Sequence, residues 1–547
     1  MAPGGDALGT KAVRLVAFPL ASLSLLIAGA PVLFADEFRS PAISAVRVEW
    51  RAALDQLRSE ITTQPAVASA FTFSGHRRVP AFDPRSTPAL VQLNAATSQI
   101  FAGIGRSPVP VLLPFDTAAF LDARLNGAPT SLSLSRYQAD FRPVDLFDAG
   151  LAGYDAVFSF EPGAGDGMPQ RTFAKPVEVQ ITGSILVYDI NDPLGGKGEP
   201  VKALSAQFPD LRRFIREGYV RYAFTRFGVP YVVSIQCLDS APRARRLACR
   251  EAYPVAERFL KALRIAGGLP SRLRTDIPAG MAERPALPPS DFTYRPSGDI
   301  IAHSGFRKQG GRADFTVYSQ IRFPLEKTIA FIHSQSFRNR KSSDKPIDEQ
   351  IGGNTGYPWQ DNFCEARSFG VGQCAGGFGH QGQDIRPAPC PPGSEGDVNS
   401  CDPRRQAVVA VRDGVVIRAP KQQAATLQIN SRTEHIRFRY MHMNPAALDV
   451  DGILNGRSVD EGEKIGVVSN YLDHPNGTSL HLHFDVQVFT RDGWLWVNPY
   501  VTLISAYERL IRGRGREIRP ESAPSPTMAH AAPENVMRPD TQEGREN

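Results

Sequence analysis

The sequence predicts an α+β protein, with a mixed α/β N-terminal region followed by a mainly antiparallel β region. Between residues 43 and 266, apolar residues recur at helical spacing in some segments and alternate like strands in others. From about residue 292 onward, short β-rich runs are separated by turn residues. A proline-rich stretch of little periodicity lies between the two regions, which indicates a linker between domains.

Length and composition place the chain among globular proteins with more than one domain. Its 547 residues are enough for two or three cores, and 42% apolar and 22% charged residues are ordinary values. The net charge of +6 comes without a dense run of lysine or arginine. We therefore expect no nucleic-acid partner, whereas an anionic polymer or a membrane surface fits the mild positive charge.

The first 35 residues indicate export. No charged residue occurs from Leu15 to Ala35, basic residues precede this run, and acidic residues follow it. This charge order favours a cytoplasmic N-terminus and an exported body. The run is long enough to span a bilayer, but residues 28–30 also resemble a signal-peptide cleavage site. We expect residues 1–35 to be a signal peptide or an inner-membrane anchor, with the body in the periplasm or cell envelope.

Residues 40–268 are expected to form one mixed α/β domain. Helical periodicity covers three segments, which are Ile43 to Ile61, Pro88 to Ile104, and Val255 to Ala266 before a Gly-Gly pair. Strand-like patterns cover Val177 to Ile190, and a hairpin is expected between Gly218 and Cys237. The only histidine of this domain is His76, so the sequence offers no catalytic constellation here and indicates no role for it.

A proline-rich linker is expected over residues 269–292, a second domain over 293–510 and a disordered tail over 511–547. The expected strands of the second domain lie within Asp314–Phe323, Ala407–Ala419, Ala425–Met443 and Leu480–Phe489. Asp413 and Gly414 lie between two apolar runs, which predicts a hairpin or a tight bend. Beyond Arg512 no apolar period remains, which is typical of a disordered segment.

Six cysteines are compatible with export, because an even number in a translocated protein predicts disulfide bonds. Pairing between sequence neighbours gives Cys237–Cys249, Cys364–Cys374 and Cys390–Cys401. The last four could alternatively hold a zinc ion as a four-thiolate site. They lack a close Cys-x-x-Cys spacing, so disulfides are the favoured interpretation.

Histidines and one carboxylate in the second region offer ligands for a metal. His481 and His483 alternate with apolar residues on one strand, so both imidazoles point to the same face. His380 and Asp384 lie four residues apart in a glycine-rich loop, and His442 follows a tyrosine further along. Two histidines and one carboxylate suit catalytic zinc, and they equally suit the facial triad of a non-haem iron oxygenase.

The strand expected around residues 434–443 has two different faces. His442 shares a face with apolar residues, which predicts a core-directed imidazole. His435 shares the other face with Arg437 and Arg439, so it is most simply a solvated residue.

The ordered set of these motifs resembles the lysostaphin/LytM-type zinc metallopeptidases. The motifs are His380-x-Gly-x-Asp384, Tyr-x-His442 and His481-x-His483-Phe, with Asn-Pro behind them, and the resemblance covers roughly residues 352–503. It implies a zinc metallopeptidase domain within 293–510, with an antiparallel sheet and a groove. By this resemblance His380, Asp384 and His483 are the zinc ligands, whereas His442 and His481 are catalytic. The implied partners are stem or cross-bridge peptides of bacterial peptidoglycan.

Two departures from the family pattern flank the expected groove. Cys364, Cys374 and glycine-rich sequence replace the usual run into the first motif, and Cys390 and Cys401 bracket a proline-rich insertion after Asp384. Which peptide bond is cut therefore stays open. The alternative function is a non-catalytic module of the same fold that binds the wall or activates other hydrolases. The five retained residues disfavour this alternative, and export together with the two additional histidines disfavours an iron oxygenase.

Overall fold

The computed structural model describes the chain from Phe38 to Ile518 with internal gaps. The described residues are 38–61, 88–125, 137–160, 172–173, 176–192, 195–237, 245–270, 284–300, 311–326, 330–332, 358–365, 367, 369–387, 406–478 and 480–518. The expected export segment, most of the expected linker and tail, and the Cys390–Cys401 pair lie outside these residues. Among the described helices, none is both long and apolar enough to cross a membrane.

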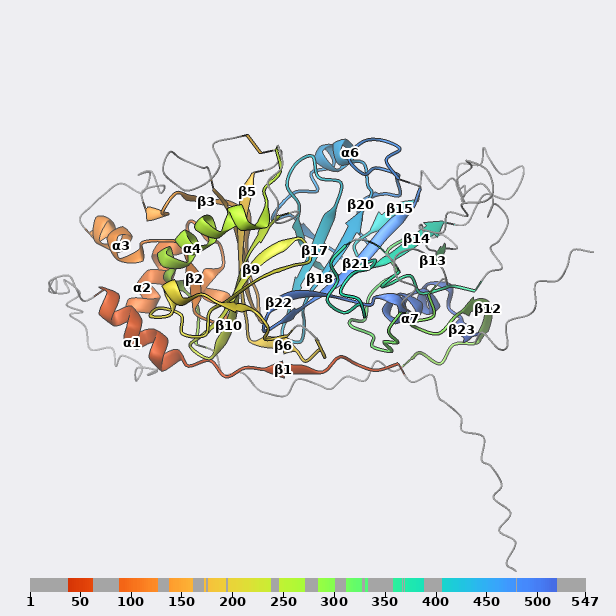
Figure 1. Cartoon of the computed structure of the whole chain (residues 1–547), viewed down its shortest axis with the longest axis horizontal. Helices are drawn as coiled ribbons and strands as arrows, with labels where there is room; N and C mark the ends of the chain where they lie inside the picture. The colour runs from red at the N-terminus through yellow and green to blue at the C-terminus, as the bar shows by residue number, and fades with distance from the viewer. Residues whose placement is uncertain are drawn as a thin grey trace, which may run out of the picture. The chain divides into compact units, whose positions relative to one another are not determined.

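The first half of the chain is built on a seven-stranded antiparallel sheet, in the order β3-β4-β5-β10-β9-β8-β7 (Figure 1). Its strands are β3 (Phe141–Ala149), β4 (Gly153–Phe160), β5 (Val177–Ser184), β7 (Glu199–Pro200), β8 (Arg212–Arg216), β9 (Tyr219–Arg226) and β10 (Val229–Gln236). Two short pairs accompany it, β1 (Ile43–Ala45) with β6 (Leu186–Tyr188) and β2 (Val111–Leu113) with β11 (Arg264–Gly267).

Helices cover one face of this sheet. They are α1 (Trp50–Ile61), α2 (Pro88–Thr97), α3 (Thr117–Leu125), α4 (Tyr253–Ala262) and the short 3₁₀ helices Ile104–Arg106, Lys202–Leu204 and Cys249–Ala252. Figure 1 shows α1 to α4 on the side of the sheet away from β17 and β18. Alternate strand residues such as Tyr154, Ile181 and Tyr231 pack against α1, α2 and α4 in one apolar core. Period-two alternation thus assigns one face of each strand to this core.

The structure confirms the α+β content, but several elements of the first half differ from the expected ones. All seven strands pair antiparallel, so the mixed helix and strand content expected for this region takes the form of an antiparallel sheet covered by helices. The helical stripe expected from Ile43 begins only at Trp50, because residues 43–45 form β1 against β6. Ala266 lies in β11 rather than in the helix, which ends at Ala262. The expected hairpin is present as β9 and β10.

The second half is built on an eight-stranded antiparallel sheet, in the order β13-β14-β21-β18-β17-β16-β19 with β22 beside β21. Its strands are β13 (Ala330–Ile332), β14 (Gln383–Pro387), β16 (Gly414–Ile417), β17 (Ala425–Asn430), β18 (His435–Met441), β19 (Ser458–Val459), β21 (Leu482–Thr490) and β22 (Gly493–Val497). The other elements are β15 (Ala407–Val409), β20 (Lys464–Val467), β12 (Pro289–Tyr294), β23 (Arg514–Glu517), α6 (Pro445–Val450) and α7 (Tyr500–Ile511).

Two expectations for the second half are wrong, and a third is confirmed in one of its two forms. Residues 314–323 carry no named strand; Thr316 makes only an isolated bridge to Arg39. Asp413 lies in a bend between β15 and β16, which pair in different sheets, so the expected tight bend is present and the alternative hairpin is not. The first residues of the expected tail are ordered instead, because β23 pairs in parallel with β12.

The two large sheets contact each other through polar side chains and through an apolar cluster of Ala223, Val232, Phe489 and Trp494. On the face of the first sheet opposite its helices, Asp155 accepts hydrogen bonds from His435 (2.7 Å) and Arg437 (2.9 Å) of β18. Trp494 of β22 donates to Thr182 of β5 at 3.1 Å. His435 is fully buried, so its expected solvent exposure is wrong. The charged face of β18 is covered by the first half of the chain, and the described residues belong to one compact unit.

Candidate metal centre

Three side chains from separate segments converge at one end of β14 and β21. Asp384 on β14 lies directly opposite His483 on β21 in the strand register. His380 lies in the loop that leads into β14. Its Nε2 is 3.0 Å from Nδ1 of His483 and 3.2 Å from Oδ1 of Asp384, and the latter two atoms are 3.0 Å apart. All three residues are buried.

Hydrogen bonds outside this triangle define which ring nitrogens carry protons. His380 Nδ1 is 3.0 Å from the carbonyl oxygen of Asn362, which can only accept, so this nitrogen donates. His483 Nε2 is 3.3 Å from a carboxylate oxygen of Asp485 and donates to it. In the neutral rings, lone pairs of His380 Nε2 and His483 Nδ1 then face each other beside the Asp384 carboxylate. Such a set of donor atoms is stable only around a cation, either a proton or a metal ion.

The geometry of the three atoms fits a zinc ion. With tetrahedral coordination and bond lengths of about 2.0–2.1 Å, neighbouring ligand atoms lie about 3.3 Å apart. The observed separations of 3.0–3.2 Å are close to this value. Asp384 Oδ2 is buried and has no hydrogen-bond partner among the described residues, which leaves capacity for a cation. Three protein ligands also match the composition of a catalytic zinc site.

The other two histidines singled out in the sequence lie against this triangle. His481, at the start of β21, places Nε2 3.5 Å from Asp384 Oδ1. The His442 ring centroid is 4.5 Å from that of His481 and 6.0 Å from that of His483. The structure therefore brings all five residues together.

His442 reaches the site by a route that the strand pattern does not predict. Strand β18 ends at Met441, and His442 has a left-handed backbone with φ of 69°. Its backbone N–H donates to Gln423 Oε1 at 2.8 Å, and its Nδ1 donates to the carbonyl oxygen of Tyr471 at 2.9 Å. The expectation of a core-directed His442 is therefore wrong, because the left-handed turn takes the residue out of the strand alternation.

Burial and neighbouring charges shift the pKa values of Asp384, His442 and His483 in different directions. Burial raises the pKa of Asp384, but the neighbouring His380 and His481 outweigh this effect and hold the pKa well below its usual value. Burial lowers the pKa of His442 to about 4, and the adjacent His483 acts in the same direction. His442 is thus a neutral imidazole at neutral pH. For His483, burial lowers the pKa, but hydrogen bonds to Asp384 and Asp485 raise it overall.

Three residues that the sequence analysis did not single out, Asp485, Arg439 and Trp496, orient the His483 ring on the side away from the triangle. Asp485 accepts from Arg439 Nε at 2.7 Å and from Trp496 Nε1 at 2.9 Å. Burial raises the pKa of Asp485, but Arg439 and His483 outweigh it and lower the pKa. The carboxylate therefore stays charged and fixes the His483 tautomer. The available signal was Asp485 itself, two residues after His483 on the same face of the strand.

The loop before His380 is closed by a disulfide bond between Cys364 and Cys374. The Cys364 backbone N–H donates to the carbonyl oxygen of His380 at 2.9 Å, and the His380 backbone N–H donates to Glu365 O at 2.7 Å. A Cβ at Gly379 would lie 2.7 Å from Cα of Cys364, so no side chain fits there. The second disulfide present, Cys237–Cys249, lies far from the site in the sequence.

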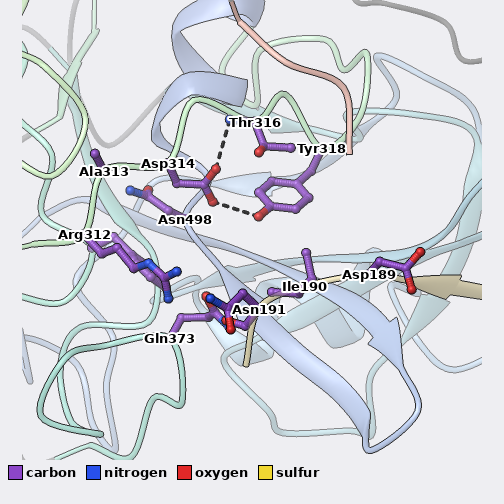
Figure 2. A pocket seen from close by; sticks show the side chains of 11 residues that line it. Asp189, Ile190, Asn191, Arg312, Ala313, Asp314, Thr316, Tyr318, Gln373 and Asn498 are labelled. Carbon is purple, nitrogen blue, oxygen red and sulfur yellow. Dashed lines mark hydrogen bonds between the residues drawn. The ribbon is translucent and has the colours of Figure 1, made fainter. Parts of the chain in front are cut away.

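A polar cavity of about 200 Å³ is lined by residues from both halves of the chain. Phe363 and Asn498 line it, whereas the preceding residue Asn362 contacts His380. Figure 2 shows Arg312 and Asn191 at this cavity, with Asp314 hydrogen-bonded to Tyr318 and Thr316. The cavity and the metal-ligand triangle are thus contacted by two residues that are adjacent in the sequence.

No protein-family model and no curated protein matches the sequence. Among solved structures, one match is a crystal structure from Ruminococcus gnavus ATCC 29149, described as a candidate glycyl-glycine endopeptidase LytM. The two share 18% sequence identity with a TM-score of 0.19. The match covers 36% of this chain and 62% of that one, so the chain spans less than two thirds of the matched structure.

Proposed function

We propose that this protein is an exported zinc metalloendopeptidase that hydrolyses peptide bonds of bacterial peptidoglycan. The observation that supports it most is the triangle of His380, Asp384 and His483, whose lone pairs converge within 3.0–3.2 Å. The motif resemblance to LytM-type peptidases supports the choice of reaction and of substrate. Stem or cross-bridge peptides of the wall are the proposed substrates, and residues 15–35 are the proposed export or anchor segment.

The bound metal and the two neighbouring histidines would have different roles in peptide hydrolysis. Zinc bound there would polarise the scissile carbonyl and make water a stronger acid. His442 donates its Nδ1 proton to Tyr471, so its neutral ring offers Nε2 as a proton acceptor. His481 lies beside it and adjacent to Asp384. The two rings together take the proton from water and stabilise negative charge that develops on the carbonyl oxygen.

Digestion of purified peptidoglycan tests this proposal. The full-length protein is incubated with sacculi, and the released fragments are identified by mass spectrometry, which also names the bond cut. We expect new peptide termini that disappear after treatment with a chelator and return with added Zn²⁺. Intact stem and cross-bridge peptides with the zinc-loaded protein would contradict catalysis and favour the non-catalytic wall-binding alternative.

Metal analysis of the same preparation separates zinc from iron. One zinc per chain after native purification is the expected result. Stoichiometric iron with oxygen-dependent turnover would instead favour the oxygenase alternative, which has the same ligand composition.

A further inference from the structure

The described part of the first half contacts the disulfide-closed loop of the metal centre at a tight turn. Strands β8 and β9 are joined by the two residues Glu217 and Gly218, with φ values of 54° and 75°. Positive φ at both positions is the type I′ hairpin turn, which prefers Asn-Gly. A glutamate in the first position is disfavoured because its Cβ crowds the backbone. A functional contact of its side chain is one reason to keep such a residue.

The Glu217 side chain is buried and directed at the loop that carries the metal ligand. Glu217 Oε1 accepts a hydrogen bond from the backbone N–H of Gly372 at 3.3 Å. Its other oxygen pairs with Arg221 at 3.1 Å, and Glu217 is 3% exposed. Gly372 lies inside the loop closed by Cys364 and Cys374.

Two neighbouring contacts hold the same loop. Arg216 is fixed by a bidentate pair with Asp192, with both distances at 2.5 Å. A side chain at Gly372 would collide with the Arg216 guanidinium, so the arginine lies directly on the loop backbone. Gln373 donates to the carbonyl oxygen of Asn191 at 3.4 Å, and Figure 2 shows both residues at the edge of the cavity. The loop is thus held at two consecutive residues.

The loop in turn supports two of the three candidate ligands. It bonds to both backbone groups of His380 through Cys364 and Glu365. Its apolar residues, including Val371 and Phe369, pack with Trp496, which donates to Asp485 behind His483. A displacement of Gly372 would therefore change the position of His380 through its backbone hydrogen bonds. It would also change the position of His483 through Trp496 and Asp485.

We propose that Glu217 is a positioning residue for the zinc centre and that the first half of the chain is a structural part of that centre. This inference rests on the zinc site of the proposed function. It gives the domain at residues 40–268 a role that the sequence did not indicate. Glu217 acts through the Cys364–Cys374 loop and does not touch the metal or the substrate.

Four variants of the full-length protein test this role. Glu217→Asn keeps a residue that the type I′ turn favours but is too short to reproduce the contact with Gly372. Gly372→Ala displaces the loop itself, because its Cβ would collide with the Arg216 guanidinium, and so tests whether a shift at Gly372 reaches the zinc centre. Glu217→Gln retains an acceptor for the Gly372 N–H. Phe227→Asn is the matched control, because Phe227 and Gly228 form the same turn, with φ values of 53° and 75°, between β9 and β10.

Three measurements are made on each variant. They are amide hydrogen exchange of peptides covering residues 364–380, zinc affinity by chelator competition, and the visible absorption spectrum of the Co²⁺-substituted protein. For Glu217→Asn and Gly372→Ala we expect faster exchange in these peptides and an altered Co²⁺ spectrum. We also expect about 10–100-fold weaker zinc binding, as for other groups that orient metal ligands. Glu217→Gln should stay near the parent protein, and Phe227→Asn should match it.

Parental exchange, affinity and Co²⁺ spectra in folded Glu217→Asn and Gly372→Ala proteins would overturn the inference. An equal loss of zinc affinity in Phe227→Asn would also overturn it, because the effect would then be general to the hairpins. If the expected changes occur but the parent protein leaves peptidoglycan intact, the inference stands and the peptidase proposal alone fails. If the parent binds neither Zn²⁺ nor Co²⁺, the exchange data alone decide whether Glu217 orders the loop.

Discussion

Asp384 and His483 lie directly opposite each other on β14 and β21, with Asp384 Oδ1 3.0 Å from His483 Nδ1. The strand register therefore places one carboxylate and one imidazole of the triangle without help from any loop. His380 is the member that depends on a loop, and its position is the more sensitive to substitutions.

His483→Ala is expected to remove both bound zinc and peptidoglycan hydrolysis, because two remaining ligands hold zinc weakly. The measurement is zinc content after dialysis against a chelator, together with turnover. His474→Ala is a matched control, since His474 is exposed and its Nδ1 contacts only the adjacent Pro475 carbonyl. Full zinc occupancy in His483→Ala would show that the ligand assignment is wrong.

His442→Ala and His481→Ala are expected to keep zinc and lose activity. A positioned acid–base or oxyanion group typically contributes about 10²–10⁴ in rate. Zinc stoichiometry, melting temperature and turnover are measured on the same preparations. Parental turnover in both folded, zinc-loaded variants would remove these histidines from the mechanism.

Replacing Cys364 and Cys374 by serine is expected to lower zinc affinity as well as stability. Replacing Cys237 and Cys249 is the matched control, because that disulfide bond closes a loop of similar length, with sequence separations of 12 for Cys237–Cys249 and 10 for Cys364–Cys374. Each pair should therefore cost a similar free energy of unfolding, about 2–4 kcal/mol. Denaturant unfolding and chelator competition test both variants. Equal zinc affinities in the two variants would contradict a special role of the loop beside His380.

Asp155→Asn is expected to destabilise the protein at neutral pH by about 3–5 kcal/mol, because it leaves His435 and Arg437 buried without their carboxylate. Burial raises the pKa of Asp155, but His435 and Arg437 outweigh it and lower the pKa in the folded state. The unfolded carboxyl group titrates near 3.9. The stabilisation by Asp155 is therefore fully present above about pH 4 and is lost as the pH falls through the lower folded pKa.

Urea unfolding of the parent and of Asp155→Asn between pH 7 and pH 3 measures this effect. The difference in unfolding free energy should shrink toward the acid end of the series. A difference that stays constant down to pH 3 would mean that Asp155 is not the titrating group at this interface.

Sequence periodicity predicted the strands that carry the site better than it predicted their surroundings. The alternation around His481 and His483 identified β21 and the common direction of the two imidazoles, because a half-buried strand has period two. The direction of the His442 side chain was not predicted by this alternation, because His442 itself has a left-handed backbone directly after β18. No local pattern reports a backbone angle of that kind at a histidine.

The exposure of His435 could not be predicted from its own strand. The face that it shares with Arg437 and Arg439 has the composition of a solvated surface, but its partner Asp155 lies 280 residues earlier. Long-range pairing of buried charges leaves no periodic signal in either segment. The same holds for Glu217, which contacts Gly372 at a separation of 155 residues.

The contact between the two sheets, in which buried charges lie beside a small apolar cluster, has a consequence for chain synthesis. Asp155 leaves the ribosome 280 residues before His435, which corresponds to on the order of tens of seconds at typical elongation rates. An apolar face exposed for that time would invite aggregation of nascent chains. The face of the first sheet carries the apolar Ala223 and Val232, which later pack with Phe489 and Trp494, but it also carries Asp155, Thr182 and Arg221. We expect these polar groups to keep part of that face hydrated until β18 and β22 have been synthesised.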